Sequence, residues 1–205
     1  MRWGVRMNNL TALFSEGMKI ANQIKLDGLA TASPGSGVHL LFGSVPSTQS
    51  LNIKFGRAFE AFFEKAVRLG DNNFVVMPAG VWSEINKDLD LIFRDDVRKI
   101  IYYRELKLNI NLDTEKIVST YEKVKYITRY LEQKYPNYKI DSAVLTWGTF
   151  DLEDLTAQSK LKKAKEYNVD VEDPNTFFQI VGLPMSKNAY ETYFRDLGNL
   201  FKGEN

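Results

Sequence analysis

Residues 87–147 constrain the fold of this chain more than any other segment, because they follow the order strand, turn, strand, helix, strand. KDLDLIF (87–93) and KIIYYRELKLN (99–109) are strand-like apolar runs, and the charged residues between them suit a hairpin turn. Apolar residues then recur at helical spacing from Asp113 or Thr114 to Leu131, before a further strand-like alternation over residues 140–147. A hairpin followed by a helical crossover and another strand predicts a mixed α/β sheet.

The flanking segments are predicted to be mostly helical. The predicted elements are a helix over residues 9–29, a loop over 31–37, a helix over 49–70, a strand over 73–78, and helices over 160–165, 177–183 and 190–201. We therefore expect a single α/β domain over residues 1–205, with a central mixed β-sheet flanked by helices. Its core is expected at about residues 49–147, with the N-terminal helix and the C-terminal helical region packed on it.

The residue types that this chain lacks exclude several kinds of site. There is no cysteine, which rules out disulfides, thiolate zinc sites and cysteine nucleophiles. The one histidine, His39, is assigned no role, and a single histidine makes histidine-rich metal sites impossible and a serine–histidine triad remote. Any metal ion must therefore be held by oxygen ligands.

The balance of charge leaves the type of partner open. The chain has 27 basic and 26 acidic residues, for a net charge of +1. A polyanion such as DNA would have to be attracted by basic residues that the fold gathers into a patch. No run approaches the ~20 apolar residues of a membrane span, so we expect a soluble, cytoplasmic protein with no membrane partner.

The predicted hairpin brings three chemically useful side chains together. Because alternate residues of a strand face the same side, Glu105 and Lys107 are predicted to point the same way. Antiparallel pairing puts Asp90, at the start of the first strand, beside Glu105 at the end of the second. Two adjacent carboxylates repel each other unless a cation lies between them, and Mg²⁺ prefers oxygen ligands.

This arrangement predicts a magnesium site. Asp90 and Glu105 would bind Mg²⁺, with the backbone carbonyl of Leu106 as a candidate third protein ligand. Lys107 would orient the attacking water and offset the charge that grows on a phosphodiester. Asp88 is the alternative to Asp90 on the same predicted face, and Asp90 is preferred because three apolar residues follow it directly. Glu-x-Lys alone is typical of many exposed edge strands, so the prediction depends on this context.

The motifs KDLDLIF and YYRELKLN resemble the core of the PD-(D/E)xK nucleases, and the whole chain resembles a type II restriction endonuclease of that group. The family pattern places an acidic residue on a core helix, an Asp at the start of one strand and Glu-x-Lys on the next. Glu60 in GRAFEAFF matches the first position, Asp90 the second, and Glu105 with Lys107 the third. The chain has Leu89 where the named pattern has proline.

The resemblance implies a restriction-endonuclease-like fold and a catalytic core at about residues 49–147. It implies that Glu60 is an accessory carboxylate reaching the catalytic water or Lys107. The implied function is a Mg²⁺-dependent, sequence-specific endodeoxyribonuclease that cuts double-stranded DNA as a homodimer, beside a cognate DNA methyltransferase in a restriction–modification system. Two alternatives stay open: a structure-specific repair or recombination nuclease of the same fold, and a non-catalytic DNA-binding protein.

Several further polar residues allow both a functional and a structural interpretation. Asn109 and Asn111 are candidate contacts to the phosphate backbone, or they cap the next helix. Lys163, in a lysine cluster, is a candidate DNA contact or part of a solvated helix face. Other lysines are expected to form a solvated helix face, and two aromatic residues to lie in the core. They are Lys116, Lys123 and Lys125, and Trp147 and Phe150.

Overall fold

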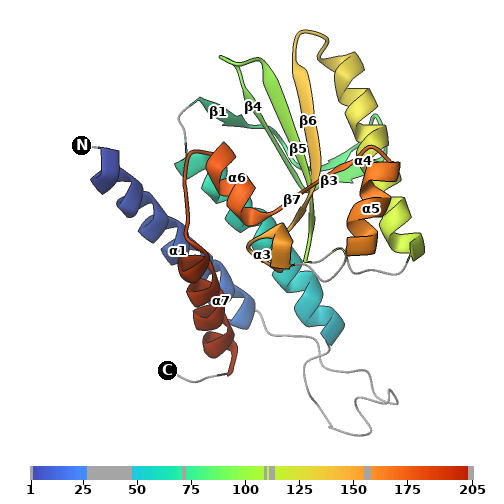
Figure 1. Cartoon of the computed structure of the whole chain (residues 1–205). Helices are drawn as coiled ribbons and strands as arrows, with labels where there is room; N and C mark the ends of the chain where they lie inside the picture. The colour runs from blue at the N-terminus through green and yellow to red at the C-terminus, as the bar shows by residue number, and fades with distance from the viewer. Residues whose placement is uncertain are drawn as a thin grey trace, which may run out of the picture.

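A five-stranded mixed β-sheet forms the middle layer of the protein, and helices cover both of its faces (Figure 1). The computed structural model describes residues 2–26, 48–70, 73–108, 110, 114–154 and 158–202. The helices are α1 (Arg2–Leu26), α3 (Thr48–Leu69), α4 (Thr114–Lys134), η1 (Leu152–Asp154, a 3₁₀ turn), α5 (Gln158–Glu166), α6 (Pro174–Ile180) and α7 (Lys187–Lys202). The strands are β1 (Phe74–Val76), β2 (Gly80–Trp82), β3 (Lys87–Leu89), β4 (Leu91–Asp95), β5 (Ile100–Lys107), β6 (Lys139–Thr146) and β7 (Asp170–Glu172). The predicted single α/β domain with a mixed sheet is confirmed.

The strand order explains why the sheet is mixed. The order is β1-β4-β5-β6-β7, in which β1, β4 and β5 are antiparallel neighbours and β5, β6 and β7 run parallel. The change occurs at β5, which enters from the β4 hairpin and leaves through α4 to β6. All positions of β5 between its two end residues are buried, as expected for a central strand covered on both faces.

A buried ion-pair network attaches the edge strand β7 to the middle of the sheet. Arg104 on β5 is 1% exposed and donates to both carboxylate oxygens of Glu172 on β7, at 2.9 and 2.7 Å. Its Nη2 atom also lies 2.8 Å from Oδ1 of Asp141 on β6. A buried guanidinium needs such partners, because an unpaired charge in the core is strongly unfavourable. The network therefore links the three parallel strands.

Each face of the sheet carries its own hydrophobic core. On the side of α3, α6 and α7 the core is aromatic, with the Phe63 and Phe177 rings edge to face at 5.1 Å between centroids. Phe150 is 5% exposed, so its expected core position is confirmed, whereas Trp147 is half-buried and packs against this core by stacking on Phe59 at 3.8 Å. The core on the side of α4 includes Leu89, Ile92, Ile101, Tyr103, Ile117, Tyr121, Val124, Ile127, Leu131 and Val144.

The predicted strand KDLDLIF is divided in the structure. Its first part is β3, which pairs with β2 in a separate two-stranded sheet, and its second part is β4. Asp90 lies between the two strands, where the chain passes from one sheet to the other. The strands β2 and β7 were not predicted, and β7 extends the sheet past residue 147. The predicted loop over 31–37 lies outside the described residues, as does His39.

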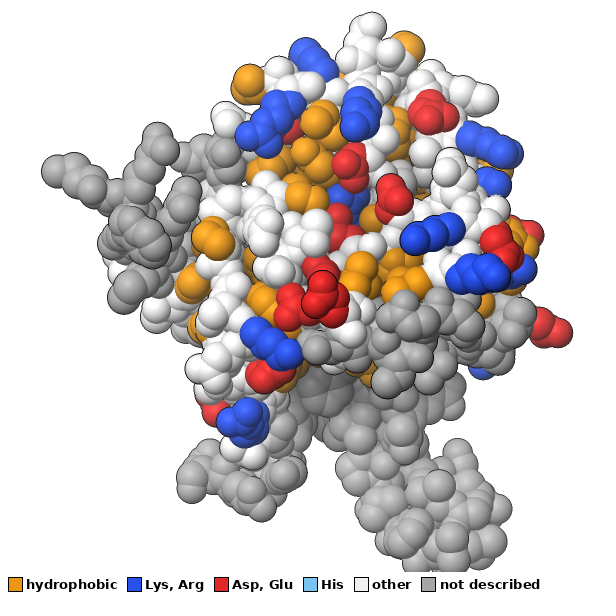
Figure 2. Space-filling view, in the orientation of Figure 1, with side chains coloured by type: hydrophobic (Ala, Val, Ile, Leu, Met, Phe, Trp, Pro, Cys, Tyr) orange, Lys and Arg blue, Asp and Glu red, His pale blue; other side chains and the backbone are white. Residues whose placement is uncertain are grey.

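The charged side chains are mixed on the face shown in Figure 2. Lys and Arg side chains alternate there with Asp and Glu, and the described residues of this face form no single large basic patch. Among the described helices, none has a stretch long and apolar enough to span a bilayer.

Candidate active site

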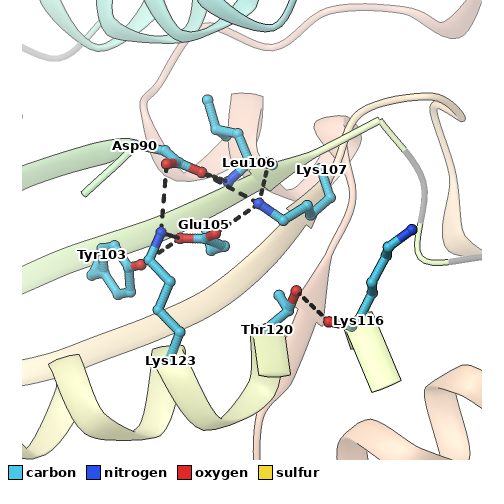
Figure 3. A network of polar contacts seen from close by, with 8 residues as sticks. All are labelled: Asp90, Tyr103, Glu105, Leu106, Lys107, Lys116, Thr120 and Lys123. Atoms are coloured by element: carbon cyan, nitrogen blue, oxygen red, sulfur yellow. Dashed lines mark hydrogen bonds and ion pairs between the residues drawn. The ribbon is translucent and has the colours of Figure 1, made fainter. Parts of the chain in front are cut away.

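Strand β5 presents Glu105 and Lys107 on the face of the sheet that α4 covers. Tyr103, two positions earlier, is fully buried in the core on the α4 side. Glu105 and Lys107 continue the same alternation and line a pocket together with residues of α4. The strand period therefore places all three side chains towards one helix (Figure 3).

Asp90 meets this row of side chains from the neighbouring strand. The β4–β5 register pairs Leu91 with Arg104, so the position before Leu91 lies across from Glu105. The Asp90 carboxylate accepts a hydrogen bond from the Leu106 backbone N–H, with 2.8 Å between Oδ2 and N. This bond holds Asp90 to β5 at the point where the ladder ends, and its side chain is 13% exposed.

Three oxygen atoms converge on the ammonium group of Lys107. Its Nζ lies 2.6 Å from Glu105 Oε1, 3.2 Å from the Leu106 carbonyl oxygen and 3.8 Å from Asp90 Oδ2. These are the three groups that the sequence suggests as metal ligands, and the structure gathers them around one point (Figure 3). In the protein alone, the Lys107 ammonium supplies the positive charge at that point.

A second lysine, which the sequence interpretation missed, enters the cluster from α4. Lys123 Nζ lies 2.5 Å from Glu105 Oε2 and 3.8 Å from Asp90 Oδ1, and the Lys123 side chain is 21% exposed. The expectation that Lys123 belongs to a solvated helix face is therefore wrong, because α4 packs with this residue over the two acids. Lys116, from the same predicted face, is exposed and extends away from the acids (Figure 3).

Tyr103 completes the set of donors around Glu105. Its hydroxyl donates to Glu105 Oε2 over 2.6 Å, so this carboxylate accepts from Tyr103, Lys107 and Lys123. Alternate residues of a strand face the same side, so the spacing that relates Glu105 to Lys107 also places Tyr103 on that side. This spacing could have predicted the contact from the sequence. Lys123 left a weaker signal, since it borders the apolar stripe of its helix, between Thr120 and Ile127.

The charges of the cluster shift the protonation of its members in different directions. Burial, followed by the charge of Glu105, raises the pKa of Asp90 above its ordinary value. Burial alone would raise the pKa of Glu105 too, but Lys107 and Lys123 outweigh it and the pKa is lowered. Burial acts to lower the pKa of Lys107, whereas the charges of Glu105 and Asp90 outweigh this effect and raise it.

A pocket of about 540 Å³ opens beside these groups. It lies between the end of β5 and α4, and Lys107, whose side chain is 28% exposed, can be reached from solvent there. Its lining residues are Lys87, Glu105, Lys107, Ser119, Thr120, Glu122, Lys123 and Tyr126. The mixture of lysines, hydroxyl groups and carboxylates suits a polar ligand such as a phosphate ester.

The other candidate residues lie at various distances from the cluster. Glu60 is exposed on α3, and its charge adds to the raised pKa of Lys107, after the larger effects of burial, Glu105 and Asp90. Asp88 is exposed on β3 and pairs across the β2–β3 hairpin, separate from the lysine contacts of Asp90. Lys163 forms an ion pair with Glu166 on its own helix, 3.0 Å apart. The candidate DNA contacts Asn109 and Asn111 lie outside the described residues.

The oxygen ligands of the cluster fit a hard divalent cation that needs only a few ligands from the protein. Within the described ranges, no three His, Cys, Asp or Glu side chains form a group that could hold a metal ion. The cluster instead offers two carboxylates and the Leu106 carbonyl, all oxygen. Mg²⁺ is commonly held by one or two carboxylates, with waters and substrate phosphates completing its shell.

The fold and the acid–lysine cluster are compatible with a restriction-endonuclease-like protein. No known protein family profile matches the chain. One curated relative is the type II restriction enzyme HinfI of Haemophilus influenzae, 38% identical over 58 residues. The match takes in 28% of this chain and 22% of that enzyme, so it covers about a fifth of the relative's length. The similarity to a restriction enzyme is thus limited to a segment of this chain.

Proposed function

We propose that this protein is a Mg²⁺-dependent, sequence-specific endodeoxyribonuclease of the type II restriction kind, acting on double-stranded DNA. The observation that carries the proposal is the convergence of Asp90, Glu105 and the Leu106 carbonyl around Lys107 Nζ. The partial similarity to a type II restriction enzyme supports the same conclusion. The PD-(D/E)xK assignment rests on Asp90 and the Glu-x-Lys of β5.

Each residue of the cluster has a defined part in the proposed hydrolysis. Asp90, Glu105 and the Leu106 carbonyl would hold Mg²⁺, which when bound stabilises charge on the phosphate and makes water more acidic. Lys107 donates hydrogen bonds to the attacking water and to the phosphate oxygens, and offsets the charge that grows as water attacks phosphorus. The oxygen of water forms the new P–O bond and its proton passes to solvent, while one ester P–O bond breaks and the leaving oxygen takes a proton from solvent to become an alcohol end. Glu60 is proposed as an accessory carboxylate acting on Lys107.

Digestion of phage DNA tests this function directly. The purified protein is expected to cut long duplex DNA into discrete fragments with Mg²⁺ and to leave it intact with EDTA. Sequencing the fragment ends then gives the site and the stagger of the cut. Smeared products, or preferred cutting of branched DNA, would favour a repair or recombination nuclease, and DNA binding without any cutting would favour a non-catalytic protein.

Substitutions at Asp90 and Lys107 assign the site. Asp90→Asn and Lys107→Ala are each expected to lower the single-turnover cleavage rate by roughly 10²–10³-fold or more, because each removes a group that acts on the transition state. DNA binding should be retained. Asp88→Asn is the matched control, an exposed acid two positions from Asp90 that should cut at the wild-type rate. Full activity in Asp90→Asn with loss in Asp88→Asn would reverse the assignment.

A further inference from the structure

The two oxygens of Glu105 have different partners, which come from different elements. Oε1 accepts from Lys107 at 2.6 Å and faces the point where the Leu106 carbonyl and Asp90 also meet. Oε2 accepts from the Tyr103 hydroxyl at 2.6 Å and pairs with Lys123 Nζ at 2.5 Å. Figure 3 shows Lys123 rising from α4 to reach this second oxygen. Oε1 thus faces the proposed metal site, and Oε2 is held by Tyr103 and Lys123.

We propose that Lys123 is a positioning residue for the hydrolysis: with Tyr103 it fixes Glu105 Oε2, and so directs Oε1 towards the Leu106 carbonyl and Lys107. The inference rests on the proposed nuclease function. It assigns the two lysines separate tasks, because Lys107 lies among Glu105 Oε1, Asp90 Oδ2 and the Leu106 oxygen, whereas Lys123 contacts the other oxygen of each carboxylate. Lys107 acts on the substrate, and Lys123 acts through Glu105.

The helix α4 gives Lys123 a defined position from which to act. Buried residues on both sides of it in the sequence, Tyr121 and Val124, pack α4 against the sheet, and both are at most 2% exposed. The Lys123 side chain is itself mostly covered, and its ammonium lies within 4 Å of both acids. A lysine on a freely solvated face would lose side-chain entropy by holding one geometry, and gains little from an exposed ion pair. Here the packing of the helix has already fixed the backbone.

Loss of Lys123 should therefore have opposite effects on metal binding and on cleavage. Without its ammonium, Asp90 and Glu105 have one fewer compensating charge, so a divalent cation is attracted more strongly. At the same time Glu105 loses one of its two donors at Oε2 and becomes free to turn. The cation binds more tightly to a carboxylate that is less well oriented, and cleavage slows.

The experiment compares Lys123→Met with Lys125→Met, a matched lysine two positions along α4 whose ammonium lies over the Tyr167 ring, 5.9 Å from its centroid. Calorimetric titration of the DNA-free proteins with Mn²⁺ should show about tenfold tighter binding in Lys123→Met than in wild type. Single-turnover cleavage at saturating Mg²⁺ should be roughly 10–100-fold slower, as for other residues that orient metal ligands. Lys125→Met should match wild type in both measurements, and Lys123→Arg should recover part of the rate.

Thermal denaturation of each variant separates a folding defect from these effects. Lys123→Met that cuts at the wild-type rate, or binds Mn²⁺ with wild-type affinity while folded, overturns the positioning role. If Lys123→Met is unfolded, the cleavage rate of Lys123→Arg decides instead. A rate below that of wild type supports the positioning role, and a rate equal to wild type overturns it. If wild type and Lys125→Met cut no DNA at all, the nuclease function fails and the role in hydrolysis fails with it. Tighter Mn²⁺ binding in Lys123→Met would then still show that Lys123 faces the acids.

Discussion

Glu105 is the residue on which the organisation of the site depends most. Its side chain is 3% exposed, yet its two oxygens accept from Tyr103, Lys107 and Lys123. A buried carboxylate with three donors, two of them charged, is fully hydrogen-bonded and stays ionised. The lowered pKa of Glu105 follows from the same contacts, since the two lysines outweigh the effect of burial.

Acid should remove the contribution of Glu105 to stability. At pH 7, Glu105→Gln is expected to lower the free energy of unfolding by roughly 2–3 kcal/mol, because the two facing ammonium groups lose their charged partner. The folded-state pKa of Glu105 lies below the ordinary value of 4.5, so its contribution is complete above that value and is lost as the pH falls through the lower folded-state pKa. Urea denaturation of wild type and variant across this range should show their difference shrinking towards zero in acid. A difference that grows in acid would contradict this explanation.

Residue-level prediction from the sequence succeeded where strand geometry alone decides the outcome. Strand parity relates Glu105 to Lys107, and hairpin pairing relates Asp90 to Glu105, so the structure brings these three together as expected. The contact of Lys123 depends on the angle at which α4 crosses the sheet, and spacing along the helix does not determine that angle. For this reason Lys123 could not be separated from an ordinary solvated lysine.

At the scale of elements, long periodic segments were predicted well, whereas two of the short strands were missed. The α4 helix and the strands β5 and β6 have many alternating or periodic positions, and these elements occur where the sequence indicates. The strands β2 and β7 have only three residues each, too few for a period to show. β7 is held by the buried pair of Arg104 and Glu172, a contact between residues far apart in the sequence.

The exit from β6 beside the site should tolerate no side chain at Gly148. A Cβ added there would lie 2.3 Å from the Leu108 carbonyl oxygen, a backbone atom that cannot move without shifting the end of β5. Gly148→Ala is therefore expected to lower the free energy of unfolding by roughly 1–3 kcal/mol, measured by urea denaturation.

Gly56 provides the matched control for this substitution. It lies in α3, and an added Cβ would have no neighbouring heavy atom within 4 Å. Gly56→Ala should raise the free energy of unfolding by about 0.5–1 kcal/mol, because alanine loses less backbone entropy in a helix. Equal effects at both positions would show that Gly148 is not in close contact with Leu108.

At the scale of the whole molecule, charge alone does not attract DNA. The net charge is +1, and basic and acidic side chains are mixed over the face seen in Figure 2. In the proposed nuclease, attraction to phosphate would come from local groups such as the lysines of the site pocket. Each chain carries one Asp90–Glu105–Lys107 cluster, so we propose that a homodimer supplies the two clusters needed to cut both strands of a symmetric site.

Dilution tests this proposed dimer. The protein concentration is lowered through the dissociation constant of the dimer. Over this range the rate of double-strand cutting of a supercoiled plasmid should fall more steeply than the protein concentration itself. Sedimentation velocity over the same concentrations should show dimers giving way to monomers, because only the dimer brings two clusters to one site. Double-strand cutting that stays proportional to protein while the sedimenting species is monomeric would contradict a dimeric nuclease.

The hairpin between the two acids has a consequence for how related chains can vary. Antiparallel pairing runs from Leu91 with Arg104 to Asp95 with Ile100, and the turn lies beyond that last pair. Residues inserted at the tip of the turn leave every pair intact, whereas a single residue inserted within either strand would reverse the facing of all positions on the far side of it. The register of the hairpin therefore does not restrict the length of this loop. Related sequences should therefore be identified by two strands of equal length on either side of a turn of any size. A fixed number of residues between Asp90 and the Glu-x-Lys motif is the poorer criterion.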